Sequence, residues 1–335
     1  SVNKKQILDI LKRFKTDKNL SVLYISHDIN SVKYIADEVF LMSNGELKSV
    51  DIKNLSEGIN QEEIYRNESS KQQSDECILE LKGVQKSFKK NGLLSLFKDK
   101  KGNTALDDIS FRLGNNQVLG IIGESGSGKT TIARILTGLE TYDKGKYFLD
   151  GHNKNLNDNK SIKEIRQNIQ MVFQNPVNSL NYLVKNRTLI KEAFEVMSGE
   201  LGSIDLDTEI SKLFKELNLD MDILDRYPGQ ISGGEAQRLA IARVLVLNPK
   251  VVIFDEAFSS LDQQTKSIIY KKLFQLQKEY KISFIFITHD INSIRSVCDY
   301  MIVMHNGKIV DQGEPDQIFI NPKSEYTSKL INNII

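Results

Sequence analysis

The sequence GESGSGKTT, from Gly123 to Thr131, decides the fold that we expect for this chain. It follows the apolar run VLGII and precedes IARILTGL, in which apolar residues recur at helical spacing. A glycine-rich loop between a buried strand and a helix can turn its main-chain N–H groups toward phosphate oxygens. The spacing G-x-x-x-x-G-K-[ST] therefore indicates a phosphate loop, and an ordinary Gly/Ser turn before a helix is the plainer alternative.

Each part of this loop has an expected role in binding a nucleoside triphosphate. We expect Lys129 to reach the β- and γ-phosphates and the Thr130 hydroxyl to ligate Mg²⁺. The residues predicted to hold the nucleotide are Gly123, Glu124, Ser125, Gly126, Ser127, Gly128, Lys129, Thr130 and Thr131.

Two carboxylates follow a second apolar run, VVIFDE, at residues 251–256. They stand at the end of a predicted strand, where α/β sheets place their chemistry. Asp255 is suited to Mg²⁺ and Glu256 to polarising a water molecule, whereas an acidic structural turn is the alternative. Gln174 and His289 each end a further predicted strand, so we expect them at the same edge of the sheet.

Composition limits the classes of protein that remain. The chain has 335 residues, of which 40% are apolar and 27% charged, and its net charge is +1. This size allows two domains, and this charge gives no general electrostatic case for binding nucleic acid or a strongly anionic membrane. No apolar run approaches the about 18 residues of a membrane span, and we see no secretion signal. Cys77 and Cys298 are isolated, which fits a reducing, cytosolic location. Because Ser1 rather than Met comes first, we expect a longer product.

A repeat links the two ends of the chain. SVLYISHDINSVKYIADEVFLMSNGEL, beginning at Ser21, matches SFIFITHDINSIRSVCDYMIVMHNGKI, beginning at Ser283, without a gap. The match aligns His27 with His289. It indicates two domains of one type, of which residues 1–65 hold the C-terminal part of the first. We interpret His27 as vestigial rather than as a second phosphate sensor.

The first 65 residues should fold as part of a larger sheet. We expect a helix over 4–14, a buried strand over 20–26, a helix over 29–36, a strand over 38–42 and a hairpin turn at Asn44-Gly45. Such a fragment lacks the strands with which its own strands would pair. It either docks on the complete domain or needs its missing half from elsewhere.

A polar linker, 66–76, is predicted to lead into a complete domain over 77–335. We expect strands over 78–88, 103–113 and 169–173, a strand and turn over 144–151, and a buried strand in KISFIFITHD, residues 281–290, with His289 at its end. We also expect a helical subdomain over about 177–248 and a C-terminal extension over about 314–335. The insertion at 91–103 is expected to fold back on its hairpin rather than to contact a partner or lipid.

The phosphate loop, Gln174, ISGGE, VVIFDE, SSLD and His289 stand in an order and spacing that resemble the ATP-binding subunits of ABC transporters. The resemblance implies an α/β P-loop NTPase cassette with a RecA-like parallel sheet core, an antiparallel β subdomain and a helical subdomain. It implies ATP and Mg²⁺ as ligands. The catalytic residues that it implies are Glu256, His289, Gln174 and Lys129, and the metal ligands are Thr130, Gln174 and Asp255.

Further residues are assigned by this resemblance alone. Phe88 is expected to stack on adenine, and Asp262 to lie in the loop that follows the carboxylates. The signature motif, LSGGQ in the family, is ISGGE here, and Glu235 is expected to place a negative charge near the γ-phosphate of an opposing domain. The motif residues assigned to that opposing ATP site are Ser232, Gly233, Gly234 and Glu235.

FQNPVNSLN, the insertion and NPKSEYTSKLI are similar to the branch of importers for oligopeptides, dipeptides and nickel. The resemblance implies an ATPase at the cytoplasmic face of the membrane that drives uptake of peptides, nickel or metal chelates. Its implied partners are two transmembrane permease subunits, a second cassette from either the missing first domain or another copy, and indirectly a solute-binding protein. No nucleic acid is expected. A soluble ABC ATPase acting on ribosomes or DNA, and a truncated chain inactive in isolation, are the alternatives.

Overall fold

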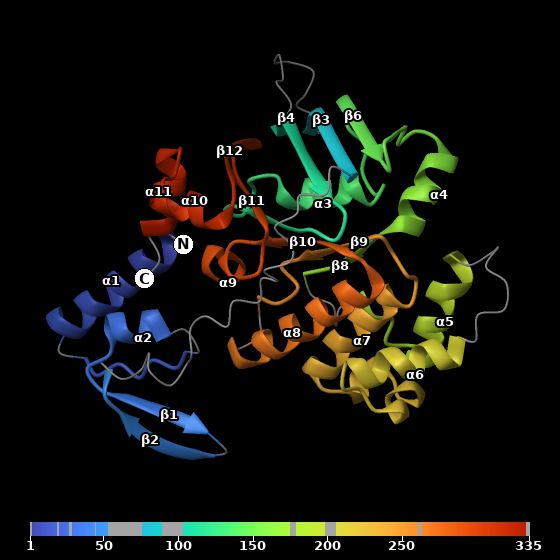
Figure 1. The fold of residues 1–335 in the computed structure, drawn as a ribbon. Helices are drawn as coiled ribbons and strands as arrows, with labels where there is room; N and C mark the ends of the chain where they lie inside the picture. Colours follow the sequence, from blue (N-terminus) through green and yellow to red (C-terminus); the bar gives the residue numbers. More distant parts are fainter. Residues whose placement is uncertain are drawn as a thin grey trace, which may run out of the picture. The chain divides into compact units, whose positions relative to one another are not determined.

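The computed structural model describes residues 2–18, 20–26, 29–43, 45–52, 76–88, 103–174, 179–197, 206–259, 261 and 263–332. The chain divides into two compact units, one of residues 1–64 with 317–335 and one of residues 65–316 (Figure 1). Several predictions fall outside the described residues: His27, Asn44, Asp262, nearly all of the linker and all but the last residue of the insertion.

The second unit contains the predicted parallel sheet. Its six strands lie in the order β12-β11-β5-β10-β9-β8, and all run parallel except β12, which pairs antiparallel with β11. β5 lies in the middle with every residue buried, so its carboxyl end opens at the centre of the sheet's edge. The strands span Lys308–Gly313, Tyr300–His305, Val118–Ile122, Ser283–Thr288, Val251–Asp255 and Ile169–Val172, in the same order.

A four-stranded antiparallel sheet packs on the same core. Its order is β4-β3-β6-β7, with strands Asn103–Gly114, Cys77–Phe88, Lys144–Leu149 and His152–Lys154. One cluster of buried apolar side chains contains residues of both sheets and of α3 (Lys129–Leu136). The phosphate-loop helix is therefore fixed to both sheets by its apolar face, on which Ile132, Ile135 and Leu136 are fully buried.

Helices form the remainder of this unit. The predicted helical subdomain contains α5 (Asn186–Met197), α6 (Leu206–Glu216), the 3-10 turns Met221–Asp225 and Pro228–Gln230, and α7 (Gly233–Leu245). α4 (Asn159–Asn168) precedes β8, and α8 (Gln263–Tyr280) and α9 (Ile291–Arg295) follow β9 and β10. α10 (Pro315–Ile320) follows β12 and spans the boundary between the two units, which lies after residue 316. With two sheets and a helical subdomain, the fold class predicted from the sequence is confirmed.

Aromatic side chains support the sheet beside the predicted carboxylates. Phe254, one residue before Asp255, stacks on Phe286 of β10 with 5.0 Å between ring centroids. Phe258 and Tyr270 extend the cluster at 5.2 Å and 5.4 Å from one ring to the next. Such ring pairs contribute about 0.5–1.5 kcal/mol each beyond the area that they bury. They hold the end of β9 in a rigid position.

The first unit consists of α1 (Val2–Asp17), α2 (Ile29–Ile35), the antiparallel hairpin of β1 (Val39–Ser43) and β2 (Glu46–Val50), and α11 (Glu325–Asn332). Leu8 of α1 and Ile35 of α2 are buried. Lys12 Nζ lies 3.7 Å from the ring centroid of Tyr34, which joins the two helices on their polar side. The two helices and the first strand of the hairpin lie near the predicted positions.

The predicted buried strand at 20–26 is wrong. These residues are described without strand structure, and the side chains of Leu23 and Ile25 are 89% and 87% exposed. In the second unit the equivalent residues, Ile285 and Ile287, belong to β10 and are buried between β5 and β9. The same apolar pattern fails to form a strand in the first unit because no strand of the described residues pairs with it there.

Candidate functional site

The predicted phosphate loop joins β5 to α3, and two of its glycines leave no room for a side chain. A Cβ atom on Gly123 would lie 2.3 Å from the Met304 carbonyl oxygen, and one on Gly128 would lie 2.6 Å from the Ala105 carbonyl oxygen. Gly128 also has a φ of +106°, which other L-residues rarely adopt. The loop therefore lies against the backbones of β4 and β11 so closely that only glycine fits at these two positions.

The side chain of Lys129 folds back across the phosphate loop. Its side chain is nearly buried, and Nζ donates to the carbonyl oxygens of Gly123 at 2.7 Å and Glu124 at 2.8 Å. Burial lowers the pKa of Lys129, while nearby carboxylates act in the opposite direction. The ammonium group is thus held inside the loop, where phosphate oxygens would complete its coordination.

Ser127 provides an observation that fits a bound phosphate. Its Oγ is buried, and no hydrogen-bond partner for it is found in the part of the chain that the structure describes. An unsatisfied buried hydroxyl is unfavourable, and a phosphate oxygen at this point would satisfy it. The remaining predicted loop residues border the open side of the loop: Ser125, Gly126 and Thr130 are exposed, and Glu124 and Thr131 are half-buried.

Asp255 and Thr130 meet beside the loop. Asp255 ends β9 with its side chain buried, and the Thr130 hydroxyl hydrogen-bonds to its carboxylate. Burial raises the pKa of Asp255, against this hydrogen bond and the charge of Lys129. The described residues include no group of three or more His, Cys, Asp or Glu side chains that could hold a metal alone. The two oxygen donors suit Mg²⁺, which commonly takes one or two protein ligands together with phosphate oxygens.

Glu256 contacts two of the other predicted catalytic residues, Gln174 and His289. Its Oε2 accepts a hydrogen bond from Gln174 Nε2 at 3.0 Å and lies 3.4 Å from His289 Nδ1. The hydrogen bond from His289 lowers the pKa of Glu256 despite its partial burial. The carboxylate is therefore ionised near neutral pH, as a base requires.

The backbone of Glu256 has a strained conformation. Its φ is +49°, an uncommon value for a residue with a side chain, and its N–H donates to the Ile287 carbonyl oxygen at 2.8 Å. This bond ties the residue after β9 to the neighbouring strand β10. Strain held by surrounding structure is frequent at functional sites, and here it occurs at the residue whose carboxylate contacts Gln174 and His289.

Phe88 ends β3 and is 43% exposed. Lys86 Nζ lies 5.2 Å from its ring centroid and pairs with Glu140 at 2.7 Å. The ring is partly exposed at the end of β3, and its stacking on adenine stays a prediction.

The signature residues open helix α7. Ser232 is the N-cap: its Oγ accepts from Glu235 N at 3.2 Å, and Glu235 Oε2 accepts from Ser232 N at 2.7 Å. This reciprocal pair is a capping box. The backbone hydrogen bond from Ser232 lowers the pKa of Glu235. Gly233 is exposed and Gly234 half-buried, so the first turn of the helix faces outward.

Comparison with known proteins identifies the family. A family model described as ABC transporter matches residues 106–259. The chain is 36% identical over 259 residues to the oligopeptide transport ATP-binding protein OppF of Streptococcus mutans, covering 77% of this chain and 81% of OppF. The chain belongs to the ABC transporter family of ATP-binding proteins. Its second unit is an ABC ATPase domain, as the sequence predicted.

Two further similarities show how much of this chain and of its relatives can be aligned. Over 337 residues it is 32% identical to the uncharacterized ABC transporter ATP-binding protein YejF of Escherichia coli K12. That match covers 97% of this chain and 63% of YejF, so the chain spans less than two thirds of this relative. A solved dimeric structure of the ATP-binding cassette MJ0796, bound to ADP and Pi, matches with a TM-score of 0.61 and 26% identity, covering 71% of this chain and 98% of that one.

Sequence reasoning missed a buried glutamine of the ABC cassette. Gln237 lies one turn into α7, and its Nε2 donates to the Ala257 carbonyl oxygen at 2.7 Å. Ala257 directly follows Glu256, so this bond connects the signature helix to the carboxylate edge of the sheet. A polar residue on the apolar face of a helix was the available signal.

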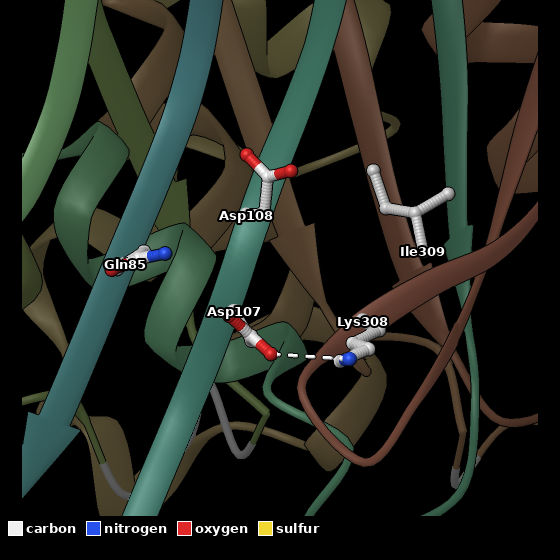
Figure 2. A pocket seen from close by; sticks show the side chains of 5 residues that line it. All are labelled: Gln85, Asp107, Asp108, Lys308 and Ile309. Carbon is white, nitrogen blue, oxygen red and sulfur yellow. Dashed lines mark ion pairs between the residues drawn. The ribbon is translucent and has the colours of Figure 1, made fainter.

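A cavity of about 540 Å³ lies elsewhere on the cassette, lined by Gln85, Asp107, Asp108, Lys308 and Ile309 (Figure 2). None of these is a predicted nucleotide-binding residue. Lys308 Nζ pairs with Asp107 Oδ2 at 3.2 Å across the cavity, and the Asp107 N–H donates to the Gly307 carbonyl oxygen at 2.8 Å. These contacts join β4 to the β11–β12 hairpin, so we assign this region a structural role.

Across the ranges that the structure describes, no helix has the length and apolar character needed to cross a membrane.

Proposed function

We propose that this chain is the ATP-hydrolysing subunit of an ABC importer, which couples ATP binding and hydrolysis to solute uptake through two membrane permease subunits. The observation that carries the proposal is the meeting of Gln174, Glu256 and His289 beside the phosphate loop. Oligopeptides are the solute class favoured by the name of the relative OppF. Nickel and metal chelates stay alternatives that rest on sequence resemblance alone.

The proposed reaction is the in-line attack of water on the γ-phosphorus of ATP. The bond between that phosphorus and the β–γ bridging oxygen breaks, and its electron pair remains on ADP. Glu256 orients the water and takes its proton, while Lys129 and the loop amides stabilise the charge that develops on the leaving phosphate. His289 is assigned to the γ-phosphate. Mg²⁺, when bound by Thr130, Asp255 and Gln174, would neutralise phosphate charge.

A second cassette completes the proposed site. The first turn of α7, in which Gly233 is exposed, would offer the signature residues to an opposing nucleotide. That partner is a second copy of this chain or another ABC cassette. The dimeric state of MJ0796 supports such an arrangement.

The proposed location is the cytoplasmic face of the membrane, reached through the permeases. Gln174 follows β8 and donates a hydrogen bond to Glu256. A movement of the chain at Gln174 would therefore shift a direct hydrogen-bond partner of the carboxylate. A solute-binding protein would take part only through the permeases. The net charge of +1 gives no support to a nucleic-acid partner.

The proposal is tested by purifying the tagged full chain from detergent-solubilised membranes of its own cells, with quantitative mass spectrometry. We expect two permease polypeptides to be enriched in equal amounts. The matched control is the same purification from cells that express the chain without the tag. Enrichment of ribosomal proteins instead of permeases would contradict the importer proposal and leave the ATPase assignment intact.

A further inference from the structure

Lys86 is a lysine buried near the end of strand β3. Only 7% of the residue is exposed, whereas Phe88, which ends the strand, is 43% exposed. Val84, two residues before the lysine, belongs to the cluster of buried apolar side chains that β3 shares with α3. Lys86 therefore lies between the apolar core and the ring that is predicted to stack on adenine.

One carboxylate holds the charge of Lys86. Its Nζ pairs with Glu140 Oε1 at 2.7 Å and lies 3.5 Å from Thr141 Oγ1. The hydrogen bond from Lys86 lowers the pKa of Glu140, so the carboxylate is ionised near neutral pH. Burying an ammonium group costs free energy unless the group is paired. The position of Lys86 is therefore determined by the position of Glu140.

Glu140 is fixed to the carboxyl-terminal end of α3. The N–H groups of Leu139 and Glu140 both donate to the Arg134 carbonyl oxygen, at 2.8 Å and 3.1 Å. Lys129, which closes the phosphate loop, begins the same helix. One helix thus sets the distance between the phosphate loop and Glu140, and the ion pair with Lys86 ties the end of β3 to that helix.

We propose that Lys86 is a positioning residue for the base of the bound nucleotide. Its ammonium group lies over the Phe88 ring, 5.2 Å from the centroid, and holds the ring in place relative to the phosphate loop. The base stacks on the face of the ring that the lysine leaves open. A ring that is already held loses less conformational freedom when the base binds, so the nucleotide binds more tightly. The inference rests on the ATPase part of the proposed function and does not depend on transport.

Two other roles fit the contacts of Lys86 less well. A direct contact to phosphate is disfavoured because Nζ is bound to Glu140, which follows the carboxyl-terminal end of α3, whereas the phosphate loop precedes the other end. A purely structural role is disfavoured because β3 has further ties to the same segment. Ser87 N donates to Asp143 Oδ2 at 2.7 Å, and Asp143 N donates to the Gln85 carbonyl oxygen at 2.8 Å. These bonds would keep the strand in place without the lysine.

The same strand provides a matched control. Lys82 Nζ lies 5.0 Å from the Phe148 ring centroid and pairs with Glu80 Oε2 at 3.0 Å. None of these three residues is a predicted nucleotide-binding residue. The Lys82 side chain is 57% exposed, against 9% for Lys86. Lys82→Met thus removes a similar pair of contacts at a place without a predicted role.

The test uses the full chain and two probes in titration calorimetry, ATP and inorganic tripolyphosphate, each with Mg²⁺. Tripolyphosphate offers the same row of phosphates but no base. The test variant Lys86→Met keeps a long, flexible side chain and removes the ammonium group. Glu140→Gln is a second variant that keeps the lysine and removes the charge that holds it. Lys86→Met is also combined with Phe88→Leu, which removes the ring.

We expect Lys86→Met to weaken ATP binding by about 3–10-fold and to bind tripolyphosphate as the parent does. Glu140→Gln should weaken ATP binding in the same direction and also leave tripolyphosphate binding unaltered. Adding Lys86→Met to Phe88→Leu should cause no further loss, because the lysine acts through the ring. Lys82→Met should bind both probes as the parent does.

Three results would overturn the inference. The first is ATP binding that neither Lys86→Met nor Glu140→Gln alters. The second is an equal loss of affinity for ATP and tripolyphosphate, which would assign Lys86 to the phosphates or to the fold. The third is a further loss on adding Lys86→Met to Phe88→Leu, which would show that the lysine acts without the ring. In all three the parent binds both probes, so the ATP site stands; a parent that binds neither would overturn the ATP site and the inference together.

Discussion

Replacing the glutamate that contacts both Gln174 and His289 is the most direct test of the proposed chemistry. Glu256→Gln keeps the size of the side chain but removes its charge. In the parent, Oε2 accepts from Gln174 Nε2 at 3.0 Å and lies 3.4 Å from His289 Nδ1. A glutamine oxygen can still accept one of these bonds, so the fold around the site should persist. The change therefore separates catalysis from structure.

The expected loss follows from the role of a general base. Such a group contributes about 10²–10⁴ in rate, which corresponds to about 3–5 kcal/mol of activation free energy. We expect ATP turnover of Glu256→Gln to fall by at least about 100-fold. ATP affinity should be retained, because Lys129 and the loop are held by bonds to Gly123 and Glu124 that the change does not touch.

Steady-state phosphate release and ATP titration calorimetry measure these two quantities separately. Light scattering with ATP should show a dimer that the parent forms only transiently. Glu325→Gln, a change at an 83% exposed side chain on α11, serves as the control and should leave turnover unaltered. Full turnover in Glu256→Gln, or a loss of ATP affinity equal to the loss of rate, would refute the assigned role.

The remaining predictions concern the loop, the signature helix and pH. Lys129→Ala should weaken ATP binding by at least about tenfold in calorimetry, because a charge-assisted contact to phosphate is lost; unaltered binding would contradict the loop assignment. Gly128→Ala should lower the free energy of unfolding by about 1–3 kcal/mol in urea titration, since alanine is strained at that positive φ and meets a carbonyl oxygen; equal stability would mean that the loop has another conformation. Gln237→Leu should cost about 1–3 kcal/mol by leaving the Ala257 carbonyl oxygen without its partner, and a fall in turnover at unchanged ATP affinity would show that it positions the neighbouring carboxylate. The lowered pKa of Glu256 predicts stability that is present above the pKa of an unfolded glutamate and lost as pH falls through the lower folded value; the unfolding free energies of the parent and Glu256→Gln should therefore converge in acid, and a constant difference down to low pH would contradict that shift.

Much of the cassette was predictable because its signals are local. The apolar run before Gly123, the loop spacing and the helical pattern after it all lie within one continuous stretch, residues 118–139. The strand ends at Gln174, Asp255 and His289 were located by the same reasoning, and a parallel sheet then brings them to one edge. The positions of these side chains relative to each other follow from the fold once the strand order is known.

The failures have physical causes that lie outside any short window. Residues 20–26 carry a strand pattern, yet a strand forms only when neighbours accept its main-chain hydrogen bonds. In the sequence, Gln237 is simply one polar residue within a predicted helix. Its hydrogen-bond partner, the Ala257 carbonyl oxygen, lies 20 residues further along the chain and could not be predicted from the helix alone. Glu235 was interpreted through its charge, although Ser-x-x-Glu at a helix start is also the pattern of a capping box. The structure shows the second interaction.

The capping box places a carboxylate of the chain itself at the N-terminal end of the signature helix. Because the carboxylate of Glu235 already sits at the positive end of α7, part of the attraction that this end offers to anions is used within the chain. An incoming phosphate group would have to share the helix end with that carboxylate or displace it. Attachment to a second nucleotide-loaded cassette should therefore become tighter when Glu235 is neutral. The strength of pairing would then depend on a side chain that is hydrogen-bonded at the start of its own helix.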